Sequence, residues 1–348
     1  MRPALTRFSA IAALAVVGFV AGCGNGTTAT KTASQDPKAA FTSSVSAIGN
    51  TDALTVTLKL DTTPAALIAL SKSDAKGKPL TQQQAADLAA AALVIEAKTS
   101  DGSKLSSAKS GSTSKTQARF AFQDNGQTLA EIRTLDNALY AQADLKSILD
   151  LFGKGSQYAD ITARVASMPE FVKALVQGKW VSLDLNSLKS LASQFGAGAS
   201  ATPNSAQTQK LLNDLRTVLG RDVTVTRVGT DSQGDHLQVT TQSRTLIGDL
   251  FHTVTSDMPQ AGLATSVIKP TSVPDHSIVL DAWVTNGALS KLSLDLAQFA
   301  KPGDVQPGQH LNVVLLFDQS GDDISKPADA TPVDMSQLMT LAGALSGK

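Results

Sequence analysis

The chain of 348 residues has few of the side chains on which many protein chemistries depend. It contains one cysteine, two tryptophans, two tyrosines and four histidines. One cysteine excludes an intramolecular disulfide and a zinc site built from several thiolates. Aromatic residues account for only 4% of the chain, so we do not expect the stacking platforms that bind sugars or bases.

Recognisable catalytic signatures are absent from the sequence as well. It has no GxSxG, HExxH or GxxxxGK(S/T) motif, and no GxGxxG motif after a predicted strand. The histidines are scattered, without a metal-ligand neighbour at helical spacing; they are His236, His252, His276 and His310. The 30 basic and 30 acidic residues balance without a basic block, which argues against a nucleic-acid partner. We therefore predict that the protein is not an enzyme and needs no cofactor or metal.

The N-terminal segment has the pattern of a secretory signal peptide. Arg2 and Arg7 supply positive charge, and residues 8–20 are almost wholly apolar. Its end resembles the bacterial lipobox, in which an aliphatic residue and two small residues precede an acylated cysteine. The matching residues are Val20, Ala21, Gly22 and Cys23. The resemblance implies that residues 1–22 are removed and that Cys23 carries acyl chains such as palmitate. An ordinary signal peptide that ends near a cysteine is the alternative.

Acylation at Cys23 predicts where the protein is found. Each buried methylene of an acyl chain contributes about 0.8 kcal/mol, so two or three chains hold a protein on a membrane. No second apolar stretch reaches the roughly 20 residues that span a bilayer. We expect an exported protein, anchored by its N-terminal acyl chains to the outer face of the cytoplasmic membrane. Residues 23–38 have the composition of a flexible tether, and residues 39–348 are predicted to form a single domain.

Hydrophobic periodicity predicts a mixture of strands and helices. Leu54, Val56 and Leu58 alternate with polar residues, as in a strand with one buried face. Residues 124–126 (Asp-Asn-Gly) and 286–287 (Asn-Gly) are hairpin signals, which favour antiparallel pairing. Strands are expected over residues 54–60, 94–99, 117–123, 127–135, 138–143, 179–184, 222–229, 236–243, 277–285, 289–296 and 310–318. Helices are expected over residues 39–48, 64–93, 144–151, 169–176, 186–195, 206–219 and 246–254, and from residue 335.

The aliphatic face of these strands needs a cover, and two arrangements are open. Helices can pack directly on the sheet and close the core. Alternatively, the helices stand off a curled sheet and leave an apolar cavity suited to acyl chains. Periodicity does not separate the two arrangements.

The C-terminal strands carry a resemblance to a known family. Residues 279–296 (VLDAWVTNGALSKLSLDL), residues 315–318 (LLFD) and residues 323–327 (DISKP) resemble segments of the LolA-like carriers of bacteria, and above all of their actinobacterial branch, the LppX/LprG-type lipoproteins. The resemblance implies an α+β fold in which a curved antiparallel sheet, a half-barrel, has helices covering its concave face. It also implies an apolar pocket that carries lipids or lipidated molecules between envelope layers. The helical material around 158–219 is then an insertion.

The leading hypothesis is a membrane-anchored lipoprotein of the cell envelope that binds, and transfers, a lipid or lipoglycan as a monomer. The residues expected to line its cavity share the alternating aliphatic faces; they are Leu54, Val56, Leu58, Phe120, Phe122, Leu280 and Leu315. A non-catalytic scaffold lipoprotein with a packed core is the first alternative. The second alternative is a solute-binding lipoprotein of an importer, which usually needs parallel strands in two lobes.

Overall fold

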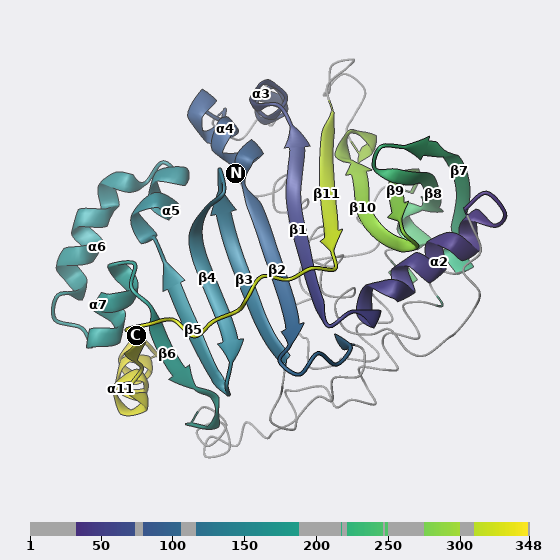
Figure 1. The fold of residues 1–348 in the computed structure, drawn as a ribbon. Helices are drawn as coiled ribbons and strands as arrows, with labels where there is room; N and C mark the ends of the chain where they lie inside the picture. The colour runs from purple at the N-terminus through teal and green to yellow at the C-terminus, as the bar shows by residue number, and fades with distance from the viewer. Residues whose placement is uncertain are drawn as a thin grey trace.

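The computed structural model describes residues 33–73, 79–105, 116–187, 217, 221–245, 248–249, 275–299 and 310–346. Its main feature is one twelve-stranded sheet in the order β12-β6-β5-β4-β3-β2-β1-β11-β10-β9-β8-β7 (Figure 1). The paired strands run antiparallel, except that β12 and β6 are parallel. The fold is therefore mixed α+β with a mostly antiparallel sheet, as the sequence predicts.

The strand bounds agree closely with the predicted ones. The strands are β1 (Ala53–Thr62), β2 (Ala92–Thr99), β3 (Thr116–Asp124), β4 (Gln127–Leu135), β5 (Ala138–Ala143), β6 (Val181–Asp184), β7 (Val223–Asp231), β8 (Gly234–Gln242), β9 (Ser277–Thr285), β10 (Ala288–Asp295), β11 (Leu311–Asp318) and β12 (Thr331–Pro332). The short strand β12 was not predicted. It forms because its backbone pairs with β6, a contact between distant parts of the chain.

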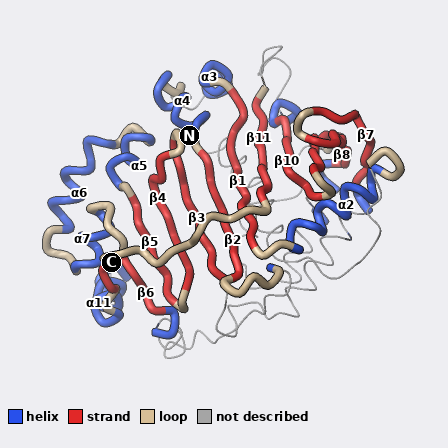
Figure 2. Tube along the Cα trace, viewed as in Figure 1, coloured by secondary structure: helices blue, strands red, loops and turns tan. Residues whose placement is uncertain are grey.

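The helices flank the sheet at several places (Figure 2). They are α2 (Pro37–Ala47), α3 (Pro64–Ser73), α4 (Gln82–Ala90), α5 (Leu145–Leu151), α6 (Tyr158–Val165), α7 (Glu170–Val176) and α11 (Met335–Ser346), with 3-10 turns at Ile48–Asn50, Gly155–Gln157 and Leu296–Phe299. Helices α6 and α7 belong to the predicted insertion around 158–219. The rest of that insertion, apart from residues 166–169, 177–187 and 217, lies outside the described residues, as does most of the helix predicted over 246–254.

The residues predicted as helical over 64–93 form two helices, α3 and α4, and the capping box that Thr81 and Gln84 predict in the sequence is confirmed. A new helix, α4, begins after Thr81, whose hydroxyl accepts a hydrogen bond from the Gln84 backbone N–H, while the Gln84 side chain accepts one from the Thr81 N–H. This reciprocal capping box satisfies two backbone donors and marks a helix start. Helix α4 ends at Ala90, so β2 begins at Ala92, two residues earlier than predicted.

Two of the hairpins depend on residues with left-handed backbones. Asn125 and Gly126 join β3 to β4 with φ angles of 49° and 78°, and Asn286 and Gly287 join β9 to β10 with φ angles of 53° and 79°. Asparagine and glycine tolerate this conformation, and the turn that uses it matches the twist of the flanking strands. The hairpins therefore set the antiparallel order of these neighbours.

Strand alternation and register give the sheet one apolar and one polar face. On the apolar face, one row of directly opposed residues crosses seven strands: Phe317, Val56, Ile95, Phe120, Ile132, Ala141 and Val181. The polar face carries the neighbouring row Thr55, Glu96, Arg119, Arg133, Tyr140 and Ser182. Because successive side chains along a strand point to opposite faces, two neighbouring rows always lie on opposite faces of the sheet.

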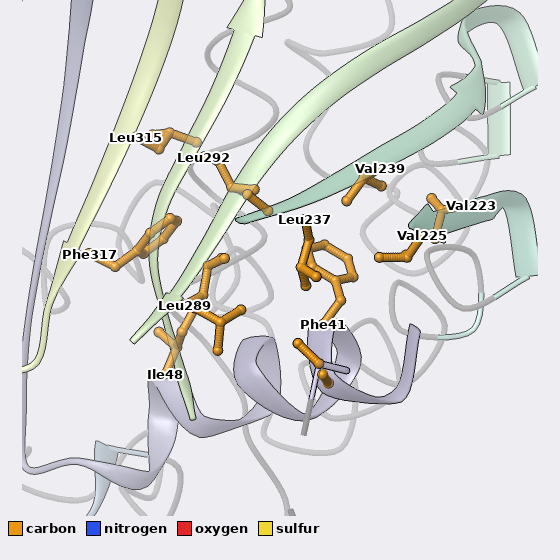
Figure 3. Packing of buried hydrophobic residues seen from close by; sticks show 14 of the residues in the cluster. Phe41, Ile48, Val223, Val225, Leu237, Val239, Leu289, Leu292, Leu315 and Phe317 are labelled. Atoms are coloured by element: carbon orange, nitrogen blue, oxygen red, sulfur yellow. The ribbon is translucent and has the colours of Figure 1, made fainter. Parts of the chain in front are cut away.

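Three helices pack on the apolar face. From α2, Phe41 joins the main core cluster with Leu237 and Leu289, as does Ile48 directly after the helix (Figure 3). From α3 and α4, Leu67 and Ala85 pack with Leu311 in a second cluster. Among the described residues, α2 thus covers the apolar face on the β7–β11 side, and α3 and α4 cover it at one end of β1, β10 and β11.

Candidate functional site

The apolar face of the sheet is the candidate site, and the register brings all seven predicted lining residues onto it. Leu58 lies opposite both Leu315 of β11 and Leu93 of β2, and Leu93 lies opposite Phe122 of β3. Leu280 of β9 lies opposite Leu294 of β10, which shares this face. The remaining residues follow by alternation; they are Leu54, Val56 and Phe120.

Burial divides the seven residues into two groups. Leu54, Val56 and Leu315 are buried in the main core cluster, and Leu58 and Leu280 pack against it. Residues Phe41 and Val45 of α2 belong to or pack against the same cluster. At these five positions the apolar face is therefore occupied by the protein's own side chains.

The two phenylalanines of β3 differ from the other five residues. Phe120 is 44% exposed, and its direct partner on β4, Ile132, is 43% exposed. The next pair along the same strands is Phe122 with Ala130, and both are half-buried. We call these four residues the apolar strip. Single exposed apolar residues are common, but here two large ones are direct partners on neighbouring strands.

Ile132 was not among the predicted lining residues, although the sequence contained the signal for it. The β3–β4 hairpin turns at Asn125 and Gly126, and Ile132 stands between the charged residues Glu131 and Arg133. Strict alternation after a tight turn places such a residue on the face opposite its charged neighbours. Its pairing with Phe120 follows from the register, which shifts between Phe122 and Gln123.

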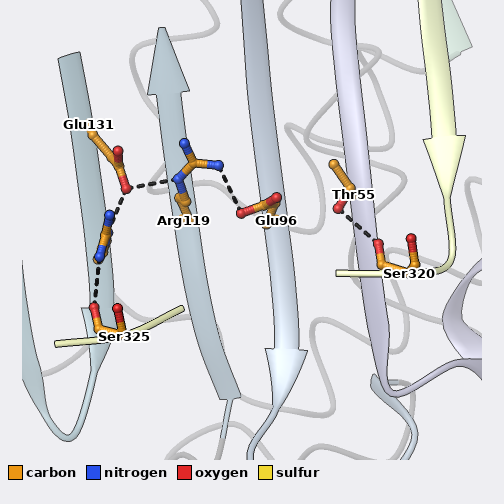
Figure 4. Close-up of polar contacts among 7 residues, drawn as sticks. Thr55, Glu96, Arg119, Glu131, Ser320 and Ser325 are labelled. Carbon is orange, nitrogen blue, oxygen red and sulfur yellow. Dashed lines mark hydrogen bonds and ion pairs between the residues drawn. The ribbon is translucent and has the colours of Figure 1, made fainter. Parts of the chain in front are cut away.

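Directly behind the apolar strip, the polar face carries a ladder of ion pairs (Figure 4). Arg119 donates from Nη1 to Glu96 Oε2 at 3.0 Å and from Nε to Glu131 Oε1 at 2.8 Å. Arg133 Nε also donates to Glu131 Oε1, at 2.5 Å. The carboxylate side chains are only 4% and 6% exposed for Glu96 and Glu131. Two guanidinium groups and two carboxylates thus neutralise one another below the surface.

The ladder changes the acid–base properties of its members. Burial alone would raise the pKa of Glu131, but hydrogen bonds from Arg133 and Arg119 outweigh it, so the pKa lies below its usual value of 4.5. Burial acts to lower the pKa of Arg119, while hydrogen bonds to Glu131 and Glu96 raise it overall. The hydrogen bonds of the ladder therefore join strands β2, β3 and β4.

Two of the described histidines make aromatic contacts. His236 stacks on Trp283 with ring centroids 4.5 Å apart, and its Nε2 lies 2.8 Å from Asp281 Oδ1. Lys291 Nζ lies 4.3 Å from the centroid of the Trp283 ring. His276 packs edge-on against Phe299. In the part of the chain that the structure describes, no three His, Cys, Asp or Glu side chains are grouped to hold a metal ion.

The predicted anchor cannot be placed on this fold. Cys23 and the lipobox residues Val20, Ala21 and Gly22 lie outside the described residues, together with the rest of the predicted signal peptide and residues 24–32 of the tether. The described chain starts at residue 33, shortly before α2. None of the helices searched within the described ranges has the length and apolarity of a membrane span.

The chain was compared with protein-family models, curated proteins and solved structures. No protein-family model and no curated protein matches the chain. Among solved structures, the chain is similar to the lipoprotein LppX of Mycobacterium tuberculosis, with a TM-score of 0.32, 10% identity, and coverage of 83% of this chain and 98% of LppX. It is also similar to LprF of Mycobacterium bovis, with a TM-score of 0.34, 10% identity, and coverage of 85% and 98%. Because both TM-scores are below 0.5, the fold of this chain is assigned from its own strand order and not from these two structures.

Proposed function

We propose that this protein is a membrane-anchored lipoprotein of the cell envelope that binds a lipid or lipidated molecule on the apolar face of its sheet. The observation that carries the proposal is the pair Phe120 and Ile132, two large apolar residues left exposed side by side on central strands. An acyl chain laid on such a surface gains about 0.8 kcal/mol for each methylene removed from water. No catalytic residue is needed, because binding and release are the whole activity.

The shape of the site forms part of the proposal. Residues 39–348 are taken as a single LolA-like domain in which the sheet curves into a half-barrel, with α2, α3 and α4 over its concave apolar face. The packing of these three helices on that face supports this arrangement. The apolar strip then lies where the helices leave the face uncovered, and the polar group of a lipid or lipoglycan would remain at the rim.

The anchor completes the proposed mechanism. Acyl chains on Cys23 would hold the protein on the outer face of the cytoplasmic membrane. The end of the range 23–38 is part of the fold, because Pro37 and Lys38 belong to α2 and Ala33 is buried in the main core cluster. The tether is therefore proposed as residues 23–32, which would reach about 33 Å when extended at roughly 3.3 Å per residue. A monomeric domain on such a tether can turn its apolar face towards the membrane to load a lipid, and away from it to deliver the lipid.

Native mass spectrometry of the purified chain, before and after solvent extraction, tests lipid binding. We expect a bound lipid at a defined ratio in the first spectrum, and its return when lipid is offered to the extracted protein. The variant Phe120→Ser should bind less. Phe152→Ser is a matched control, because Phe152 is also exposed but lies just after α5.

A clean apo mass with no lipid uptake would overturn the proposal in favour of a non-catalytic scaffold lipoprotein. One observation favours that second function: Leu54, Val56 and Leu315 are packed within the core instead of lining a space. An importer's solute-binding lipoprotein is less compatible with the fold, because β12 and β6 form the one parallel pair among the described strands.

A further inference from the structure

The segment that joins β11 to β12 crosses the polar face of the sheet. Residues 319–330, which we call the strap, run in front of β1 to β5 and end beside β6 (Figure 1). Thr55 Oγ1 donates to the Ser320 carbonyl at 3.0 Å, and Arg133 Nη1 donates to the Ser325 carbonyl at 2.8 Å (Figure 4). After the strap, the Val333 backbone N–H donates to the Ser182 carbonyl at 2.8 Å.

These attachment points belong to one row of the sheet. Thr55, Arg133 and Ser182 lie in the row of directly opposed polar-face residues that also contains Glu96 and Arg119. The strap therefore runs across the strands, above the ion-pair ladder. A segment held to β1, β4 and β6 at once fixes the position of these strands relative to one another.

The strap is held by few apolar contacts. Ile324 is buried with Leu135 and Tyr140, and Pro327 is also buried. The other attachments are polar and close to solvent; in the ion pair of Lys98 with Asp323, the Asp323 side chain is 94% exposed. Exposed hydrogen bonds and ion pairs of this kind contribute little net stability, since water replaces them.

The ion-pair ladder beneath the strap lowers the free energy needed to release the strap. Glu96 and Glu131 are almost fully buried with their arginine partners. Buried charges lose much of their hydration, and the ion pairs only partly offset this loss. Lifting the strap returns water to the ladder, so part of the lost contact energy is recovered. A segment with these properties can open without unfolding the sheet.

Strands β3 and β4 carry ladder residues on one face and the apolar strip on the other. Arg119 precedes Phe120, and Ile132 stands between Glu131 and Arg133. The strap above and the strip below are therefore separated by one sheet thickness. Any change in the spacing or twist of β3 and β4 on the polar face changes the spacing of Phe120 and Ile132 on the apolar face.

We propose that the strap is a latch: closed, it fixes the strands behind the apolar strip, and released, it lets β2, β3 and β4 move so that the exposed residues Phe120 and Ile132 can adjust their spacing to a ligand. The ligand part of this inference rests on the proposed lipid-binding function. The latch itself does not, because strand mobility is measurable without any lipid.

The test locks the strap to the sheet in the purified full chain. Thr55→Cys combined with Ser320→Cys joins β1 to the strap by a disulfide when oxidised. Thr226→Cys combined with Gln238→Cys joins direct partners on β7 and β8, away from the strap, and serves as the matched control. Each pair is compared in its oxidised and reduced forms, with mass spectrometry confirming the crosslink.

Two readouts separate the latch from the function. Amide hydrogen exchange should be about tenfold slower in β2, β3 and β4 in the locked strap variant than in its reduced form, because local opening governs exchange. Uptake of a fluorescent fatty acid should be slower in the locked form and recover on reduction. The control pair should change neither. Equal exchange in the locked and reduced forms overturns the latch, whereas the absence of uptake in every form overturns the proposed function alone.

A loosening variant keeps the inference testable where the disulfide does not form. Ile324→Ser removes the main apolar attachment, so exchange in β2, β3 and β4 should rise while β8 and β9 keep their protection. Pro332→Ala is its control, because Pro332 is exposed in β12, directly after the strap. A uniform rise over the whole sheet, or none at all, would show that the strap is a passive connection.

Discussion

Phe120 and Ile132 are direct cross-strand partners, and both remain more than two fifths exposed, at 44% and 43%. Their neighbours in sequence, Arg119 and Glu131, are joined by a hydrogen bond of 2.8 Å on the opposite face of the sheet. The same two strands therefore carry a nearly buried ion-pair ladder on one face and an uncovered apolar pair on the other. This arrangement is the basis of the first prediction.

Replacing the exposed pair should weaken lipid binding without unfolding the protein. A double variant, Phe120→Ser with Ile132→Thr, removes apolar contact worth about 1.5–3 kcal/mol per fully buried side chain, so affinity should fall by about tenfold or more. Titration with a fluorescent fatty acid measures the affinity, and thermal unfolding checks the fold. Unchanged affinity in the double variant would place the ligand elsewhere.

Replacing a core residue should instead lower the stability of the fold. Leu237 is fully buried in the main cluster, opposite Ala282. Leu237→Ala should reduce the free energy of unfolding by about 2–5 kcal/mol, because it removes apolar contacts and leaves a cavity. Urea denaturation measures the change, and Val228→Ala on β7, at a residue 57% exposed, is the control with little expected effect. A small loss for Leu237→Ala would indicate a loosely packed interior.

The ladder should make stability depend on pH in the acid range. The pKa of Glu131 is lowered in the fold by its arginines, despite its burial. Its stabilisation is therefore complete above the unfolded-state pKa of about 4.3 and is lost as pH falls through the lower folded-state pKa. Unfolding free energies measured from pH 7 to pH 3 should fall less steeply for Glu131→Gln than for the wild type.

The control for that measurement is Glu170→Gln, at a side chain 76% exposed on α7. This substitution makes the same chemical change at a carboxyl group outside the ladder. The variant Arg119→Met removes a cation from the ladder. It should lower the free energy of unfolding by about 3–5 kcal/mol at neutral pH, because it leaves two nearly buried carboxylates short of a partner. Equal slopes for the wild type, Glu131→Gln and Glu170→Gln would mean that the ladder contributes nothing to the pH dependence.

Acylation at Cys23 predicts the behaviour of the whole protein in cells. Cys23→Ser should remove the site of acylation, and the chain should shift from the membrane fraction to the soluble fraction, since acyl chains supply the membrane affinity. Cell fractionation and metabolic labelling with a palmitate analogue measure the change. Ser34→Ala, in the chain that follows the predicted anchor, should leave both signals as they are. Labelling that persists in Cys23→Ser would exclude the predicted site.

The sequence by itself determined most of the secondary structure and the assignment of side chains to faces. Alternation of apolar and polar residues identified the strands, and the Asn-Gly turns set the antiparallel hairpins, because both signals act over a few residues. The same local rules assigned Leu54, Phe120 and Leu315 each to the apolar face of its own strand. They apply equally to Ile132, which was not among the predicted lining residues.

Tertiary structure alone decided which of those residues are covered. Whether Leu54 is buried and Phe120 exposed depends on where α2, α3 and α4 pack, and β1 meets β11 only through pairing between opposite ends of the chain. The strap over the ladder and the parallel β12–β6 pair have the same origin. Periodicity fixes the face to which a side chain points, but burial depends on segments brought together by long-range packing, and these leave no periodic trace in the sequence.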